Sequence, residues 1–144
     1  MKLLQWSLPL AMLGTLGDAL PAADCDKIPS WTFKNLKWHT LDTVGQNGSA
    51  SFTLVNSVTD KAVDLKCTLV ANYRCQIKTD DATEVTLQAQ NGVLYVWVDQ
   101  DLTCGDATVK HVGGSADLDM NCDIVQHEDI NCTAEESQIK GDVV

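Results

Sequence analysis

Basic residues, histidine and aromatic residues are all scarce in this sequence. There are 10 Lys and Arg against 20 Asp and Glu, and the formal net charge of −10 predicts repulsion from nucleic acid and from anionic membranes. His39, His111 and His127 lack the His-x-His or His-Glu-x-x-His spacing that brings two imidazoles to one metal. We therefore predict no metal site and no cofactor. The acidic surface favours solubility or, as the sharper alternative, attraction to a basic partner.

Catalytic motifs are also missing. Ser115 lies in GGSAD, which lacks the Gly-x-Ser-x-Gly spacing of a nucleophile elbow. Carboxylate pairs such as Asp80 with Asp81, or Asp99 with Asp101, are expected from composition in so acidic a chain. A glycosidase would also need a sugar cleft alongside its two carboxylates, and so small a domain can rarely line one. The sequence therefore predicts no catalytic residue and no enzyme.

Long apolar runs are absent except at the start of the chain. A basic Lys2, the apolar stretch 3–16 and small residues at 17–23 are typical of a secretory signal peptide, which is too short to span a bilayer. We expect residues 1–19 to be removed by cleavage after Ala19, with Ala22 as the next choice. Residues 20–144 then form a single secreted domain. Its net charge stays near −10 because cleavage removes one Lys and one Asp.

Cysteine, by contrast, is plentiful. An even number in a small secreted protein predicts three disulfides, formed by the six cysteines at Cys25, Cys67, Cys75, Cys104, Cys122 and Cys132. The short separation favours Cys67 with Cys75. We then pair Cys104 with Cys122 and Cys25 with Cys132, although six cysteines allow many other pairings.

Alternating hydrophobicity predicts several β-strands in the first half of the chain. In WTFKNLKWH, Trp31, Phe33 and Asn35 share one side, opposite Leu36. A second strand, 49–56, places Phe52 and Leu54 on one face. A third, 63–71, has apolar residues at alternate positions, namely Val63, Leu65, Cys67 and Leu69.

The clearest local signal is a hairpin that joins strands 84–90 and 93–99. Asn91 and Gly92 both tolerate the positive φ angles of a type I′ turn. Leu94, Val96 and Val98 would share one face, with Tyr95 and Trp97 on the other. We expect this strand to be central and covered on both sides, which makes Trp97 a core residue.

The remainder of the chain predicts shorter elements. A strand at 109–112 would be broken at Gly113 and Gly114 before a second strand at 115–123. The tail 129–144 would form one helical turn capped by Thr133, with Glu136 three residues later, and otherwise be frayed and flexible. The predicted fold class is all-β, an antiparallel β-sandwich or β-barrel stapled by disulfides.

The segment DLDMNCDIVQHE, residues 117–128, mimics a calcium-binding loop. Oxygen-bearing residues stand at its first, third, fifth and seventh places, and Glu128 stands at the twelfth. Cys122, however, occupies the sixth place, where the sharp turn needs glycine. We therefore prefer a half-buried strand whose carboxylates face water.

The remaining candidate sites are two glycosylation sequons and one predicted binding surface. Asn47 and Asn131 match the N-glycosylation sequon, although the second has Cys132 at its middle position. Trp38, His39 and Asp42 form the predicted binding surface, because tryptophan is enriched at interface hot spots and loops on a rigid sheet carry recognition.

The order of features resembles small cysteine-rich proteins secreted by filamentous fungi. It is most similar to the Alternaria major-allergen-like family, in the WTF strand, SFTL at 51–54, YRC at 73–75 and GSADLDMNC at 114–122. The resemblance implies a β-sandwich or barrel that acts in virulence as an effector or allergen, contacting host proteins or small ligands. Members often carry two internal bridges and form dimers, whereas six cysteines here can all pair within one chain, which favours a monomer.

The function expected from the sequence is therefore binding outside the cell without catalysis. The partner would be an extracellular host protein or a small ligand, and neither nucleic acid nor membrane. Two alternatives remain open: a secreted inhibitor or antimicrobial toxin, and a small secreted hydrolase.

Overall fold

A computed structural model describes residues 25–41, 48–126 and 129–144, and this part of the chain is all-β, without a helix. Its strands are β1 (Ser30–Thr40), β2 (Gly48–Asn56), β3 (Ala62–Thr68), β4 (Arg74–Lys78), β5 (Thr83–Gln90), β6 (Val93–Thr103), β7 (Val109–Gln126), β8 (Asp129–Ala134), β9 (Ser137–Lys140) and β10 (Asp142–Val143). The predicted all-β class is confirmed. The predicted signal segment lies outside the described residues.

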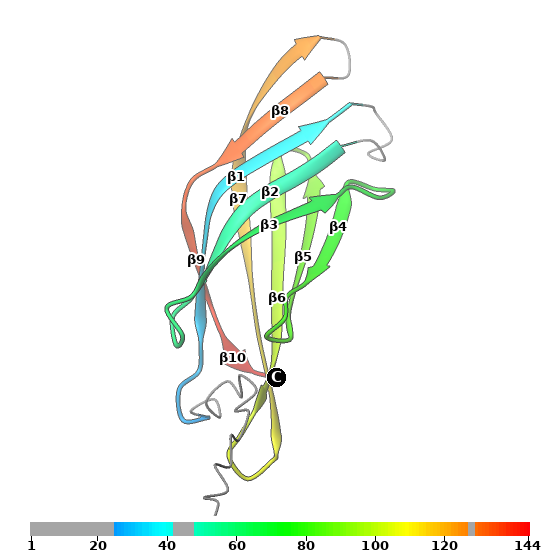
Figure 1. Ribbon diagram of the computed structural model, residues 1–144. Coiled ribbons are helices and arrows are strands. Elements are labelled where there is room, and N and C mark those ends of the chain that lie inside the picture. The colour runs from blue at the N-terminus through cyan, green and yellow to red at the C-terminus, as the bar shows by residue number, and fades with distance from the viewer. Residues whose placement is uncertain (1–24, 42–47, 127–128) are drawn as a thin grey trace, which may run out of the picture.

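The strands form one antiparallel sheet that curls into a nearly closed barrel (Figure 1). The order around the sheet is β3-β2-β1-β8-β7-β6-β5-β4, while β9 also pairs with β1 and β10 with β7. The ends of this path, β3 and β4, are joined by a short turn and lie side by side (Figure 1). Apart from a single bridge between Val70 and Arg74, no backbone pairing of the described residues closes the barrel between them.

The barrel interior is filled by alternate residues of the predicted strands. Phe52 and Leu54 of β2 are buried, and Phe33 of β1 stacks on Phe52 with ring centroids 4.6 Å apart. The side of β6 that carries Leu94 and Val96 also faces inward, and both residues are fully buried. These predicted faces are confirmed. The Asn91–Gly92 hairpin is confirmed as well, with φ angles of 53° and 79° at the two turn residues.

A β-bulge in β1 reverses the predicted alternation of that strand. Asn35 has a φ of 58°, and the pairing with β2 shifts register between Lys34 and Lys37. The extra residue turns every later side chain to the opposite face. Leu36 and Trp38 therefore point into the core beside Trp31 and Phe33, and the predicted placement of Leu36 on the side opposite these two residues is wrong.

The C-terminal part of the chain is more regular than predicted. The predicted strand break at Gly113 and Gly114 is wrong, because β7 runs continuously through both residues. The C-terminal segment packs closely against them. A Cβ atom on Gly114 would lie 2.4 Å from the backbone oxygen of Lys140. The predicted helical turn and frayed tail are also wrong, because β8, β9 and β10 occupy this segment and Ile139 is fully buried.

Three disulfides close the fold, and only one of the predicted pairings is correct. Cys67–Cys75 is confirmed. The other two bridges are Cys25–Cys104 and Cys122–Cys132. The sequence-based pairing fails because the unpredicted strand β8 places Cys132 directly opposite Cys122, with their Cα atoms 4.0 Å apart. Three disulfides are consistent with an extracellular protein.

Candidate functional site

Trp38 does not contribute to the predicted binding surface. Trp38 is only 3% exposed, because the bulge at Asn35 turns its side chain inward. His39 is partly exposed, and its Nε2 lies 2.7 Å from Oδ1 of Asp129 on β8. Asp42 lies outside the described residues. Trp38 is therefore a core residue and cannot anchor a partner.

The two glycosylation candidates have different outcomes. Asn47 lies outside the described residues. Asn131 is exposed on β8, and its amide donates a hydrogen bond to Asp129 at 3.4 Å. Its side chain is accessible although the neighbouring Cys132 is bonded to Cys122.

The calcium-loop resemblance is explained by a strand, as preferred above. Residues 117–126 belong to β7, where Leu118 is buried and Asp117 and Asp119 are exposed. Extended backbone spreads alternate carboxylates about 6.6 Å apart along one face, whereas a calcium loop wraps its ligands around one ion. The described ranges bring together no group of three His, Cys, Asp or Glu side chains that could hold a metal.

An aromatic pair lies on the outer face of the barrel. Tyr95 and Trp97 of β6 stack with ring centroids 6.2 Å apart and an interplanar angle of 21°. Trp97 is 39% exposed, so the predicted core position is wrong. The reason is that a single curled sheet has only one buried side, and no second layer of the described residues covers the outside of β6.

Polar and acidic side chains surround this pair. On one side of β6, Thr86 and Gln88 of β5 lie across from Trp97 and Tyr95. On the other side, Ser115 lies opposite Trp97 and the exposed Asp117 lies opposite Tyr95. Asp99 continues the outer side of β6 two residues beyond Trp97. We call the surface formed by Gln88, Tyr95, Trp97, Asp99, Ser115 and Asp117 the aromatic face; Thr86 is only 9% exposed and is not part of it.

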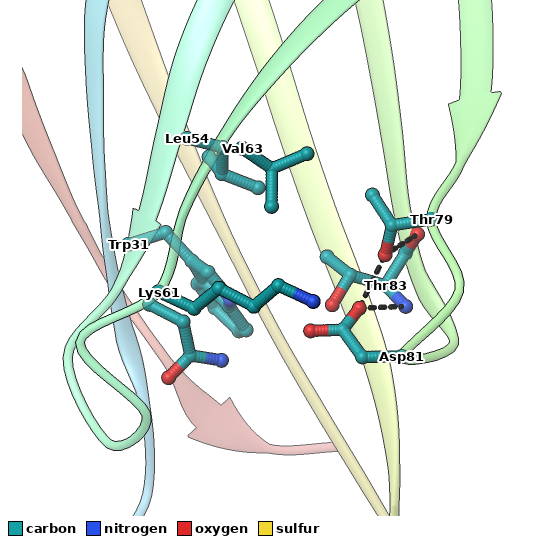
Figure 2. A pocket seen from close by; sticks show the side chains of 8 residues that line it. Trp31, Leu54, Lys61, Val63, Thr79, Asp81 and Thr83 are labelled. Carbon is teal, nitrogen blue, oxygen red and sulfur yellow. Dashed lines mark hydrogen bonds between the residues drawn. The ribbon is translucent and has the colours of Figure 1, made fainter. Parts of the chain in front are cut away.

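A second site is a small pocket between the free edges of β3 and β4. Its cavity volume is about 10 Å³, which is room for about one water molecule. It lies at the end of the β3–β4 opening away from Cys67–Cys75, since Val63 stands near the start of β3 and Thr79 follows the end of β4. We call it the seam pocket; its lining residues are Trp31, Leu54, Asn56, Lys61, Val63, Thr79, Asp81 and Thr83 (Figure 2).

Asp81 supplies the negative charge of the seam pocket. Its Oδ1 accepts hydrogen bonds from the Thr79 hydroxyl and, at 3.2 Å, from the Thr83 backbone N–H. Burial by itself raises the pKa of Asp81, but the hydrogen bonds from Thr79 and Thr83 and the positive charge of Lys61 together lower it below the ordinary value of 3.8. Asp81 is therefore ionised at neutral pH.

Trp31 also lines this pocket, and its indole N–H is unpaired in the described part of the chain. Its side chain is fully buried, and its indole Nε1 has no hydrogen-bond partner among the described residues. An unsatisfied buried donor costs about 1–3 kcal/mol. Most buried polar groups in proteins are paired with protein or with ordered water, and an ordered water is the expected partner of this nitrogen.

Sequence reasoning missed both sites. It placed Trp97 in the core because both faces of β6 carry large apolar or aromatic side chains. The sequence does not indicate whether another part of the chain covers the face that carries Tyr95 and Trp97. It placed Trp31 and Phe33 on the same side of a strand but had no signal for an unpaired nitrogen. The Asp-x-Thr spacing at Asp81 and Thr83 is a turn signal that points to Asp81 from sequence.

The fold and sites define a disulfide-stapled, nearly closed β-barrel with an exposed aromatic face and a small seam pocket. Compared with known proteins, the sequence matches no family model and has no significant similarity to any curated protein. None of the described residues forms a helix long and apolar enough to span a membrane.

Proposed function

We propose that this is a secreted binding protein of the fungal effector or allergen type, which recognises an extracellular host protein through the aromatic face without catalysis. The observation that carries the proposal is the exposed, stacked pair Tyr95–Trp97 on the outside of a rigid sheet. Tryptophan and tyrosine are enriched among the residues that dominate binding energy. Both offer a large contact area and a polar group at little cost in side-chain entropy.

The position of the pair supports recognition further. Both rings stand on β6, which is hydrogen-bonded on both sides to β5 and β7 and is therefore held rigidly. A preformed surface loses little conformational entropy on binding, so more of the contact energy becomes affinity. The hydrogen-bonding groups of Gln88, Ser115 and Asp117 surround the rings, as polar groups rim the apolar centre of protein interfaces.

The charge of the surface favours a basic partner. Asp99 and Asp117 are exposed beside the rings, and the whole chain carries a net charge of −10. Complementary charge steers association, and a Lys or Arg side chain stacked on Trp97 would gain a cation–π interaction of about 0.5–2 kcal/mol. The partner surface is therefore expected to present lysine or arginine.

Affinity capture from plant apoplastic fluid tests the proposal. The wild-type protein, Trp97→Ala and Ile124→Ala are immobilised at equal density, and the retained proteins are identified by mass spectrometry. Ile124 is the matched control, because it is 74% exposed on β7 and lies outside the aromatic face.

We expect one or more basic host proteins to bind the wild type and Ile124→Ala equally. Binding of the same purified protein to Trp97→Ala should be weaker by about tenfold or more, as expected for loss of a hot-spot tryptophan. Equal binding by all three proteins would refute the aromatic face as the recognition surface. Turnover of a substrate by the wild type in a hydrolase panel would refute the non-catalytic assignment.

A further inference from the structure

The glycosylation sequon at residues 131–133 lies in strand β8 rather than in a loop. Asn131 and Thr133 are both exposed, and Cys132 between them is only 4% exposed. Because side chains two residues apart in a strand share a face, Asn131 and Thr133 point outward together while Cys132 points into the barrel. A bulky glycan on Asn131 would therefore extend into solvent and leave the core undisturbed.

The folded surface around Asn131 tolerates this modification. Nδ2 of Asn131 donates a hydrogen bond to Oδ1 of Asp129 at 3.4 Å, and the same oxygen lies 2.7 Å from Nε2 of His39. An asparagine amide has two N–H groups, and a bond to a sugar replaces only one of them. The second N–H remains available to Asp129, so both contacts are compatible with a glycan.

The folded sheet nevertheless withholds the sequon from a transferring enzyme. Strand β8 lies between β1 and β7, and each of the three sequon residues is paired on both sides (Figure 1). A strand of this kind opens only at a free energy that approaches the free energy of global unfolding. An enzyme that binds the whole sequon therefore has to act before β8 joins the sheet.

The disulfide Cys122–Cys132 determines when that interval ends. It ties the middle residue of the sequon to the residue directly opposite on β7. At about 5–20 residues per second, the 10 residues that separate the two cysteines take about 0.5–2 s to synthesise. Formation of the disulfide then takes seconds or longer. Glycosylation and disulfide formation therefore compete on the same timescale, and neither is complete before the other begins.

We propose that Asn131 is an N-glycosylation site whose occupancy is limited by formation of Cys122–Cys132. The sugar donor is an oligosaccharide linked to a lipid diphosphate. Nδ2 of Asn131 loses a proton and bonds to the first carbon of the oligosaccharide, while the bond from that carbon to the diphosphate oxygen breaks and the lipid diphosphate leaves. The inference rests on the secretion stated in the proposed function and is independent of the aromatic face.

The occupancy of Asn131 in protein made by yeast cells tests the proposal. Two forms are expressed, the full chain and residues 20–144 behind a yeast leader peptide. Both carry Asn47→Gln, because residues 47–49 form the other sequon of the chain. Protein from cells and medium is pooled, so that variants that fold poorly are counted equally. Release of the glycan by peptide-N-glycosidase in H₂¹⁸O labels each modified Asn131 for quantification by mass spectrometry.

Cys122 and Cys67 provide a matched pair of variants. Each belongs to a bridge of short sequence separation, 10 and 8 residues, but only Cys122 bonds a sequon residue. We expect partial occupancy in the parent protein. Cys122→Ser should raise the ratio of modified to unmodified Asn131 by about twofold or more because the competing reaction is removed, and Cys67→Ser should leave the ratio unchanged. Thr133→Val should abolish the glycan.

Brief treatment of the growing cells with dithiothreitol delays disulfide formation without any cysteine substitution, and it should raise the same ratio in the parent protein. Three outcomes would overturn the proposal. They are an unmodified Asn131 in the form with the yeast leader even under dithiothreitol, complete occupancy in the untreated parent protein, and an equal rise in both cysteine variants. An unmodified full chain beside a modified form with the yeast leader would support the site and refute secretion instead.

Discussion

Asp81 illustrates how a few local hydrogen bonds determine the charge state of one residue. The turn between β4 and β5 brings Thr79 and Thr83 to the same carboxylate oxygen, and the Thr79 backbone N–H donates to the Thr83 carbonyl at 2.8 Å. Burial opposes the ionised form, but the hydrogen bonds from Thr79 and Thr83 to Asp81, together with the positive charge of Lys61, outweigh burial, so the pKa of Asp81 is lowered. The same carboxylate therefore stabilises the turn and charges the seam pocket.

The first prediction concerns the pH dependence of stability. Because the folded pKa of Asp81 lies below its ordinary value of 3.8, its contribution is present above about pH 3.8. The contribution is lost as the pH falls from 3.8 through the folded pKa. Asp81→Asn should thus be less stable than the wild type at pH 6, and the difference should shrink below about pH 3.8. Urea unfolding between about pH 2.5 and 6 measures this, and a constant difference would contradict it.

The tryptophans give a second prediction at the residue scale. Trp38 is 3% exposed and Trp97 is 39% exposed, although their sequence surroundings suggest the reverse. Trp38→Ala should destabilise the protein by about 3–5 kcal/mol, and Trp97→Ala by about 1 kcal/mol or less. Chemical denaturation of both variants measures the two costs. Equal costs would contradict the inward placement of Trp38.

At the scale of elements, the β-bulge of β1 has the largest consequence for the interior. Without it, Lys37 would point inward and Trp38 outward. With it, Trp31 and Phe33 before the bulge and Leu36 and Trp38 after it all pack on the same side. Asparagine is among the few residues that adopt positive φ readily, which suits it to position 35.

The third prediction follows from this backbone. Asn35→Val should destabilise the protein by about 1–2 kcal/mol, because a β-branched residue is strained at a φ of 58°. Asn35→Gly serves as the control and should cost less than about 0.5 kcal/mol, since glycine adopts this conformation freely. Urea denaturation measures the free energy of unfolding of both variants. A valine variant as stable as the glycine variant would exclude a positive φ at this position.

The elements that could be predicted from sequence are those defined by local signals. Asn91–Gly92 determines its hairpin through the φ angles of two residues, and Phe52 and Leu54 reveal their strand by period-two alternation. The tail was mispredicted because β9 and β10 are stabilised by distant pairing, with β1 and β7. Non-local pairing of that kind leaves little trace in a short segment with weak alternation.

At the scale of the whole molecule, covalent links hold three different parts of the barrel. Cys67–Cys75 joins the edge strands β3 and β4, and Cys122–Cys132 joins the neighbours β7 and β8. Cys25–Cys104 ties the segment before β1 to the connection between β6 and β7, and Nζ of Lys110 in β7 also donates to the Cys25 carbonyl at 3.0 Å. The sequence separation is 79 residues for Cys25–Cys104 and only 8 residues for Cys67–Cys75.

The fourth prediction uses this difference in loop length. In the chain-entropy model, removing Cys25–Cys104 should cost about 4–5 kcal/mol, and removing Cys67–Cys75 about 2–3 kcal/mol. Paired Cys→Ser variants compared by urea denaturation measure both costs, and non-reducing peptide mapping establishes that the other two bridges are intact. A larger loss from the short loop would contradict the prediction.

Neither candidate site could be predicted from sequence, and the reason lies in the whole fold. The exposure of Trp97 depends on the absence of a second layer over β6 in the described residues, and the seam pocket depends on the barrel remaining unpaired between β3 and β4. Both are properties of how the sheet closes. Residue patterns indicate which face of a strand is apolar. They do not indicate between which two strands the barrel stays unpaired, or whether another layer covers its outer side.

Recognition through the outer side of β6 is tested most directly by amide hydrogen exchange. The protein is measured alone and saturated with the host protein that the capture experiment identifies. Slower exchange is expected at 86–88, 95–99 and 115–117, with no change in β2 and β8. Slower exchange confined to β1, β2 and β8, with these three segments unchanged, would show that the partner binds elsewhere.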